Sequence, residues 1–370
     1  MLKEMMGLKI DDKFLIKNDD DKESLDRAID SLKLSGTSEI VEEYEKKLAT
    51  FFGSKHAIAV SSGTAAIHSA LCALGVKNGD EVIVPSTTVM MTVIPVLQQS
   101  AIPVFADTNR DNFGFDIDSL KRCITDKTKA IICVPMWGYP FDYKELKEVS
   151  EDNQIPIVED AAQAHNSTYD GKKVGTIGDV GCFSTHDKKI LSTGEGGYVL
   201  TDNEELYEKI KSFIQFGYMK GEDFGLNYKI STLQAAIGIS RIEKIDWQVR
   251  ARTKNAKAIL NGLNNKDIHE IKYPKNSSPN YYSMVLQMSY PLDKVRNIID
   301  SLMKFGIPSD VLKYDYKVLY QYPLFRKWKK SCPNSEYLSK TITTIPVHPN
   351  VSESELNYMV SSLNKISEAD

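Results

Sequence analysis

The sequence of 370 residues has few cysteines and no two of them in a C-x-x-C pair. An odd, dispersed set argues against a disulfide framework or a zinc site, and fits reduced thiols in the cytoplasm, where we place the protein. The six histidines are equally scattered, so we predict no bound metal. The five cysteines are Cys72, Cys123, Cys133, Cys182 and Cys332.

Long hydrophobic runs and a strong charge of one sign are also missing. The longest apolar stretches are shorter than the ~20 residues that a membrane helix needs, and the opening MLKEMMGLKIDDKF reaches charged residues too early for a signal peptide. The formal net charge of −4 gives no reason to expect nucleic acid or a membrane surface as a partner. A hydrophobic content of 42% and a charged content of 26% are ordinary for a globular protein.

Strand-sized apolar runs alternate with helical segments through the first two thirds of the chain. Such continuous runs are typical of a mostly parallel sheet covered by helices on both faces. Helices are expected near 20–36, 38–53, 64–75, 88–98, 116–123, 143–152 and 203–215. The expected strands are His56–Val60, Glu81–Val84, Ile102–Ala106, Ala130–Val134, Ile155–Val158, Val180–Ser184 and Gly197–Thr201.

The chain is too long for one core and favours two domains. A long helical stretch near 230–262 bridges to the second, where strands Met284–Met288 and Thr343–Val347 are flanked by helices near 292–305 and 352–366. We therefore predict an α/β fold, in which a large domain (1–245) has a mostly parallel mixed sheet sandwiched by helices. A smaller C-terminal α+β domain (246–370) follows it.

Ligands in open α/β sheets collect at the carboxyl ends of the strands, and three segments at such positions could carry chemistry. After the first strand, Ser61-Ser62-Gly63-Thr64-Ala65 leads into a helix whose amides could bind a phosphate, although taken alone it reads more easily as an ordinary capped helix.

The second segment, Glu159-Asp160-Ala161-Ala162-Gln163, ends another strand. An acid at this place is often only a helix cap. An aspartate here could instead keep the ring nitrogen of a pyridoxal cofactor protonated.

The third segment, from Phe183 to Gly197, is the most specific. A strand ends at the hydroxyl of Ser184, and Lys189 follows five residues later, before a Gly-Glu-Gly-Gly turn. Two adjacent lysines are usually a solvated face. A lysine near a hydroxyl and a glycine turn could instead supply the amine of a Schiff base.

Together these segments resemble the DegT family of sugar aminotransferases, a branch of the fold type I pyridoxal-phosphate enzymes. The resemblance runs from about Leu34 to Ile366. It includes SGTSEIVEEYEKKLATFFG, VEDAAQA, the lysine segment with GEGG, FGLNYKISTLQAAIGISRIEKID and IPVHPNVSESEL. It implies pyridoxal 5'-phosphate as cofactor, an amino-acid donor (usually L-glutamate), and a keto sugar as acceptor, most often linked to a nucleotide. It also implies a homodimer with shared active sites.

Carried over to this chain, the resemblance assigns the Schiff base to Lys189, with Lys188 only a neighbour. Asp160 would face the pyridinium nitrogen and act in catalysis with Lys189, and Gln163 would face the phenolic oxygen. The resemblance gives the phosphate to Gly63, Thr64, Ala65 and Ser184, with Asn227 reaching the partner's cofactor. Candidate substrate contacts are His186, Lys229, Lys313, Tyr314 and Tyr316, although the tyrosines could equally bridge core and water.

Two positions depart from the family pattern. Val89 stands where an aromatic ring commonly stacks on the cofactor, and Lys229 stands where an arginine is frequent, which loses a bidentate fork for anions. Both departures leave the substrate open, so a free cyclitol or an acidic keto sugar stays an alternative acceptor. Related enzymes that dehydrate deoxysugars replace the lysine with histidine, and Lys189 argues against that activity. A regulator without enzymatic activity would be expected to carry a nucleic-acid module, and none is visible.

Overall fold

The computed structural model describes residues 10–12 and 14–366 of the chain. Its centre is a seven-stranded sheet in the order β1-β9-β8-β5-β4-β2-β3. β9 pairs antiparallel with both of its neighbours, and the remaining strands run parallel to one another. The strands are β1 His56–Val60, β2 Glu81–Pro85, β3 Ile102–Ala106, β4 Thr128–Cys133, β5 Ile157–Asp160, β8 Val180–Ser184 and β9 Gly197–Thr201. This is the predicted mostly parallel mixed sheet.

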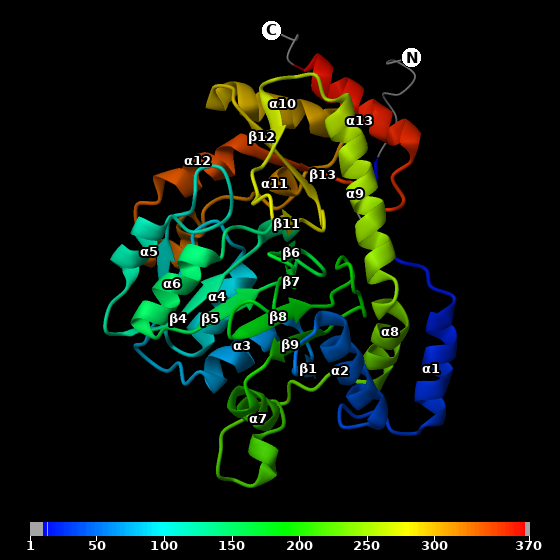
Figure 1. Ribbon diagram of the computed structural model, residues 1–370, viewed down its shortest axis with the longest axis vertical. Helices are drawn as coiled ribbons and strands as arrows, with labels where there is room; N and C mark the ends of the chain where they lie inside the picture. The colour runs from blue at the N-terminus through cyan, green and yellow to red at the C-terminus, as the bar shows by residue number, and fades with distance from the viewer. Residues whose placement is uncertain (1–9, 13, 367–370) are drawn as a thin grey trace.

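Helices cover both faces of this sheet, as Figure 1 shows. One face packs against α3 (Gly63–Ala73), α4 (Met90–Gln98) and α7 (Glu204–Phe213). The other face packs against α2 (Glu39–Phe52), α5 (Ile117–Cys123), α6 (Lys144–Asn153) and α8 (Thr232–Ile242). Neighbouring residues of a strand face opposite sides, so in β2 Val82 and Val84 enter the first core and Ile83 enters the second. Such two-sided burial explains the continuous apolar runs in the sequence.

The C-terminal part has its own antiparallel sheet, in the order β10-β12-β13. Its strands are β10 Ile268–Glu270, β12 Met284–Met288 and β13 Ile342–Ile345. The long helix α9 (Ile245–Gly262) rises from α8 to this part (Figure 1). The other helices here are α10 Leu292–Lys304, α11 Asp310–Lys313, α12 Pro333–Thr341 and α13 Glu353–Lys365. A further small sheet combines β6 Thr168–Tyr169, β7 Lys172–Lys173 and β11 Ser277–Ser278.

Several predicted bounds are wrong. The first helix, α1, is Asp20–Asp30 and does not reach Gly36, because Leu32 has a left-handed φ of 56°. The stretch 230–262 is two helices that separate between Ile242 and Ile245. β5 spans Ile157–Asp160 instead of the predicted Ile155–Val158. Asp160 is therefore the last residue of the strand.

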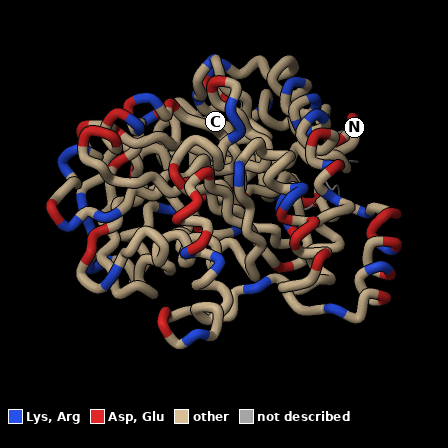
Figure 2. The backbone as a smooth tube through the Cα atoms, turned by 60° about the horizontal axis from the view of Figure 1, so that its bottom comes forward, with Lys and Arg blue, Asp and Glu red and all other residues tan. Residues whose placement is uncertain are grey.

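Basic and acidic residues are interspersed along the backbone in the view of Figure 2. No helix in the described ranges combines the length and the apolar content that crossing a bilayer requires.

Candidate active site

Lys189 lies in the loop that joins β8 to β9. Main-chain hydrogen bonds close this loop, from the Thr193 amide to the Thr185 carbonyl (2.7 Å) and from the Lys189 amide to the His186 carbonyl (2.8 Å). The hydroxyls of Thr185 and Thr193 also lie 2.6 Å apart. Gly196, with a φ of 142°, has no room for a side chain, because a Cβ would lie 2.5 Å from Thr185 Oγ1. The glycines of the GEGG turn therefore allow the loop to fold tightly around the lysine.

Two helices hold the same loop from behind. Gln248 of α9 donates to the Ile190 carbonyl (2.6 Å), and Arg241 of α8 donates to the Ser192 carbonyl (2.9 Å). The side chains of Ile190 and Leu191 are buried in the core beneath. With both flanks fixed, the loop holds Lys189 in the lining of a pocket.

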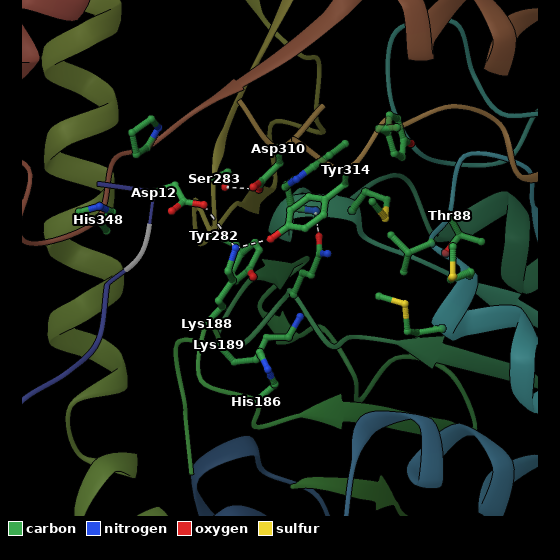
Figure 3. A pocket seen from close by; sticks show the side chains of 18 of the residues that line it. Asp12, Thr88, His186, Lys188, Lys189, Tyr282, Ser283, Asp310, Tyr314 and His348 are labelled. Carbon is green, nitrogen blue, oxygen red and sulfur yellow. Dashed lines mark hydrogen bonds and ion pairs between the residues drawn. The ribbon is translucent and has the colours of Figure 1, made fainter. Parts of the chain in front are cut away.

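The two adjacent lysines have different surroundings. Burial lowers the pKa of Lys189 from 10.5 to about 8, and the Asp160 carboxylate partly opposes this shift. Its Nζ lies 5.0 Å from the centre of the Tyr282 ring. Lys188 points to the pocket rim, where its Nζ donates to the Tyr314 hydroxyl and lies 3.4 Å from Asp12 Oδ2 (Figure 3). Burial alone would lower the pKa of Lys188, but these partners raise it. Lys189 is thus the more readily neutral amine of the pair.

The acids that end β5 are also divided between two tasks. Glu159 is fully buried and accepts from the amides of Gly175, Ile177 and Gly178 at 2.9, 2.7 and 2.8 Å. Asp160 accepts from the Thr92 hydroxyl (2.6 Å) and, more weakly, from the Ala162 amide (3.2 Å). Glu159 therefore holds a loop, whereas Asp160 remains in electrostatic contact with Lys189.

Burial raises the pKa of Asp160, while Thr92, Ala162 and Lys189 all favour its ionised form. Burial thus favours the protonated form of Asp160, and the hydrogen bonds and the Lys189 ammonium favour the carboxylate. The interaction with Lys189 is mutual, since the two groups affect each other's pKa.

The start of α3 lies directly against the end of β8. A Cβ on Gly63 would come within 2.8 Å of the Ser184 Cβ, so only glycine allows this approach. Within the described ranges, neither the Gly63 nor the Thr64 amide donates a hydrogen bond. The Ala65 amide, by contrast, donates to the Ser62 side chain (3.0 Å). Two free amides, the Thr64 and Ser184 hydroxyls and a helix N-terminus form a place suited to a phosphate.

A cavity of about 470 Å³ is lined by Lys189 and its neighbours, and its volume is within the usual size range of small-molecule sites. Figure 3 shows it from close by. Of the predicted site residues it is lined by Val89, Gln163, His186, Lys189, Tyr314 and Tyr316. The Gln163 side chain accepts from the Trp137 amide (2.6 Å), and the Tyr316 hydroxyl donates to the Thr87 carbonyl. The structure therefore brings six of the predicted residues to one pocket.

The other predicted residues do not line the cavity. Asn227 is exposed and accepts from the Lys229 ammonium (2.7 Å), in a segment bridged to the end of β1 at Val60. Lys313 stands just outside, with its ammonium bound to Asp12. The pocket lining also does not include Asp160, Gly63, Thr64, Ala65 or Ser184.

Sequence reasoning missed several lining residues that come from distant parts of the chain. Arg252, in α9, is buried and donates to the carbonyls of Tyr281 and Tyr282 (3.2 and 3.0 Å). Asp310 accepts from the Ser283 hydroxyl (3.2 Å), and burial raises its pKa. No motif marks these positions, because folding alone brings them to Lys189. The lining also includes Asp12, Phe14, Trp137 and His348.

Nowhere in residues 10–12 and 14–366 do three or more His, Cys, Asp or Glu side chains gather in a way that could hold a metal ion.

Comparison with known proteins identifies the family of this chain. The profile of the DegT/DnrJ/EryC1/StrS aminotransferase family matches residues 16–364. The chain belongs to this family. It is 29% identical over 354 residues to a GDP-perosamine synthase of Escherichia coli O157:H7, covering 93% of this chain and 95% of that one. It is 31% identical to a GDP-4-keto-6-deoxy-D-mannose 3-dehydratase of Yersinia pseudotuberculosis, over 78% and 81% of the two chains.

The fold agrees with this family. The structure matches that of an aminotransferase from Psychrobacter cryohalolentis with a TM-score of 0.88 and 26% identity, covering 95% of this chain and 98% of the other. The DegT family is one of sugar aminotransferases that depend on pyridoxal phosphate, and the dehydratase is a relative with a different named activity.

The residues present fit that cofactor. An amine of lowered pKa faces a cavity, a buried carboxylate lies within its electrostatic reach, and a glycine-tight helix start offers two amides without acceptors. The cofactor needs an amine, an anion beside its ring nitrogen and a phosphate site, and each has a counterpart here.

Proposed function

We propose that this DegT-family protein transfers the amino group of an amino acid, L-glutamate, to a nucleotide-linked keto sugar in two half-reactions. The observation that carries the proposal is the Lys189 amine, which faces a cavity and has a pKa lowered to about 8 beside the buried Asp160. Only a neutral amine can attack a carbonyl carbon. Lys188, whose pKa is raised, is the poorer candidate.

Bound pyridoxal phosphate supplies an aldehyde that an amine can capture and a ring that accepts electrons from a substrate carbon. We assign Lys189 as its covalent anchor and Asp160 as the anion that keeps its ring nitrogen protonated. Thr92 and the Ala162 amide stabilise that anion. Gln163, placed by the Trp137 amide, would face the phenolic oxygen.

The phosphate would lie at the start of α3. The Gly63 and Thr64 amides and the hydroxyls of Thr64 and Ser184 would bind it, because the amides have no other acceptor in the described chain. Ala65 contributes less, since its amide already donates to Ser62. Its part is to continue the helix whose dipole favours the anion.

When its amine is not bound to the cofactor, Lys189 would be free to move a proton. A group whose pKa lies near 8 can accept a proton from the donor's α-carbon and return it one step later. The Tyr282 ring beneath the amine limits where the side chain can swing. One residue thus serves first as anchor and then as general acid and base.

Apolar side chains line the cavity next to this amine and keep water from the reacting carbon. Val89, Met136 and Trp137 contribute to that wall. Val89 has no ring to stack on the cofactor, so a smaller aliphatic side chain would contact it here. The acceptor would enter past His186, Tyr314 and Tyr316, while Lys229 and Lys313 stand further out.

We further propose a homodimer in which Asn227 reaches the partner's cofactor. Asn227 is exposed, and its segment carries large apolar side chains at the surface, among them Met219 at 82% and Phe224 at 79% exposure. An exposed apolar segment of this kind is typical of an interaction surface.

A dehydratase is the second candidate, because one relative at 31% identity carries that name. In that branch histidine takes the place of the anchoring lysine, whereas Lys189 is present here. A free cyclitol or an acidic keto sugar remains the alternative acceptor, and Val89 is the departure that favours it.

Absorption spectra of the purified protein test the proposal. Glutamate should convert the yellow form to the pyridoxamine form, and nucleotide-linked keto sugars should restore the colour. Lys189→Ala should abolish both changes, while Lys188→Ala, the matched control, should retain the glutamate-driven change. Normal turnover by Lys189→Ala would contradict the proposal, and release of water from a deoxysugar without transfer of nitrogen would favour the dehydratase.

A further inference from the structure

The N-terminal segment places the Asp12 carboxylate at the pocket. Asp12 lines the cavity and pairs with two ammonium groups, those of Lys188 and Lys313 (Figure 3 labels Asp12 and Lys188). Lys188 also donates to the Tyr314 hydroxyl. Although burial would raise the pKa of Asp12, the two lysines lower it, so this carboxyl is an anion at neutral pH. Asp12 therefore neutralises a site built of two cations and a hydroxyl.

The segment around Asp12 is fastened on both sides. The Ile10 amide donates to the Gly306 carbonyl (3.1 Å), and the Asp11 carbonyl lies 2.9 Å from His348 Nε2. The Phe14 ring packs on the His348 ring with centres 6.1 Å apart. The backbone thus has anchors that do not depend on the Asp12 side chain, and the carboxylate can leave its lysines without releasing the segment.

Without the Asp12 carboxylate the cationic side chains at the pocket would outnumber the acidic ones. Arg252 lines the same cavity, and its guanidinium is held by main-chain carbonyls, with no carboxylate partner among the described residues. The other acid of the lining, Asp310, accepts from Ser283 and opposes part of this positive charge through its electrostatic interaction with Lys188. Lys188, Lys313 and Arg252 would then attract any anion that enters.

We propose that Asp12 is an internal substitute for the anionic part of the acceptor. In the free enzyme it occupies an anion subsite made by Lys188, Lys313 and Tyr314, and the diphosphate of the sugar nucleotide displaces it. This inference rests on the proposed function, because the diphosphate belongs to the proposed acceptor. A diphosphate is the better ligand, since its several charged oxygens can contact both lysines and the phenol while a single carboxylate offers two.

The alternative is a simple tie that fastens the N-terminal segment. The two ideas predict different signs. If the pair is only a tie, removing either partner weakens the same structure and affects binding alike. If Asp12 competes with the ligand, removing the acid should strengthen binding and removing the lysine should weaken it.

Titration calorimetry of the holoenzyme with GDP and with UDP separates these cases without any turnover. We expect Lys313→Met to bind the diphosphate about tenfold more weakly, as for the loss of one charged contact of about 1.4 kcal/mol. Lys313→Arg should restore most of the affinity. Asp12→Asn should bind about threefold to tenfold more tightly. Lys272→Met breaks a surface pair with Asp111 and should leave the affinity unchanged.

Weaker or unchanged diphosphate binding by Asp12→Asn would overturn the inference. Tighter binding of glutamate in place of the diphosphate would overturn it too, because the subsite would then belong to the donor. The glutamate-driven spectral change of the wild-type enzyme is recorded in parallel. Its failure would contradict the proposed function and would leave the diphosphate affinities interpretable by themselves.

Discussion

Glu159→Gln tests the division of tasks between the two acids that end β5. Glu159 has no exposed surface, and its Oε1 accepts from the Ile177 and Gly178 amides while its Oε2 accepts from Gly175. Glutamine offers one acceptor oxygen, so two of these bonds lose their ionic character and the third amide faces an NH₂ group. This change should loosen the segment 174–179 without touching the cofactor groups.

The cost follows from these contacts. An unsatisfied buried amide costs ~1–3 kcal/mol, and loss of charge from two hydrogen bonds adds roughly 0.5–1 kcal/mol each. The neutral amide is cheaper to bury than a carboxylate, which offsets part of the sum. We expect a net loss of about 3 kcal/mol in local stability, equivalent to roughly 100-fold more frequent opening.

Amide hydrogen exchange measured by mass spectrometry reads this opening directly. The peptide that contains Gly175, Ile177 and Gly178 should lose about 100-fold of its protection in Glu159→Gln. Asp160→Asn, the adjacent acid, is the matched control and should leave that peptide protected. Equal protection of this peptide in Glu159→Gln and the wild type would refute the reasoning.

Three further predictions concern the cofactor groups. Burial lowers the pKa of Lys189 to about 8, so the rate at which the cofactor-free protein captures pyridoxal phosphate should rise tenfold per pH unit below pH 8 and level off above it. Stopped-flow absorbance measures this rate. A rate that still rises past pH 10 would contradict the prediction. Thr92→Val removes a hydrogen-bond donor from Asp160, so the rate of the glutamate half-reaction should fall about tenfold, and Thr92→Ser should restore it. A wild-type rate for Thr92→Val would refute the role of Thr92 in supporting Asp160. Gly63→Ala should raise the dissociation constant of the cofactor more than tenfold, because the new methyl group would lie 2.8 Å from the Ser184 Cβ. A fluorescence titration measures this constant. An unchanged constant would place the phosphate elsewhere.

The sheet could be read from the sequence because its strands are buried on both faces. His56–Val60 and Val180–Ser184 form strands with the predicted bounds. Ile155–Val158 was displaced by two residues, since Ile155 and Pro156 precede the strand and the acids Glu159 and Asp160 extend it. Burial of acids inside a strand requires specific hydrogen-bond partners, and a sequence pattern does not show these. The division of the chain near residue 245 stays a prediction.

Several of the site residues that local motifs predict share one cavity, because each motif follows the end of a strand. Lys189, Gln163 and Val89 share one cavity, and all follow strands of the large sheet. Arg252 and Asp12 could not be found in this way. They reach the cavity from a long helix and from the N-terminal segment, and only tertiary packing brings these to the lysine loop.

The most direct measurement is the site of attachment of the cofactor. The holoenzyme is reduced with borohydride and digested, and the peptide that carries the pyridoxyl group is sequenced by mass spectrometry. The modification should lie on Lys189, the amine beside Asp160. Attachment to Lys188, or to no residue between Ser184 and Gly197, would contradict the proposed site.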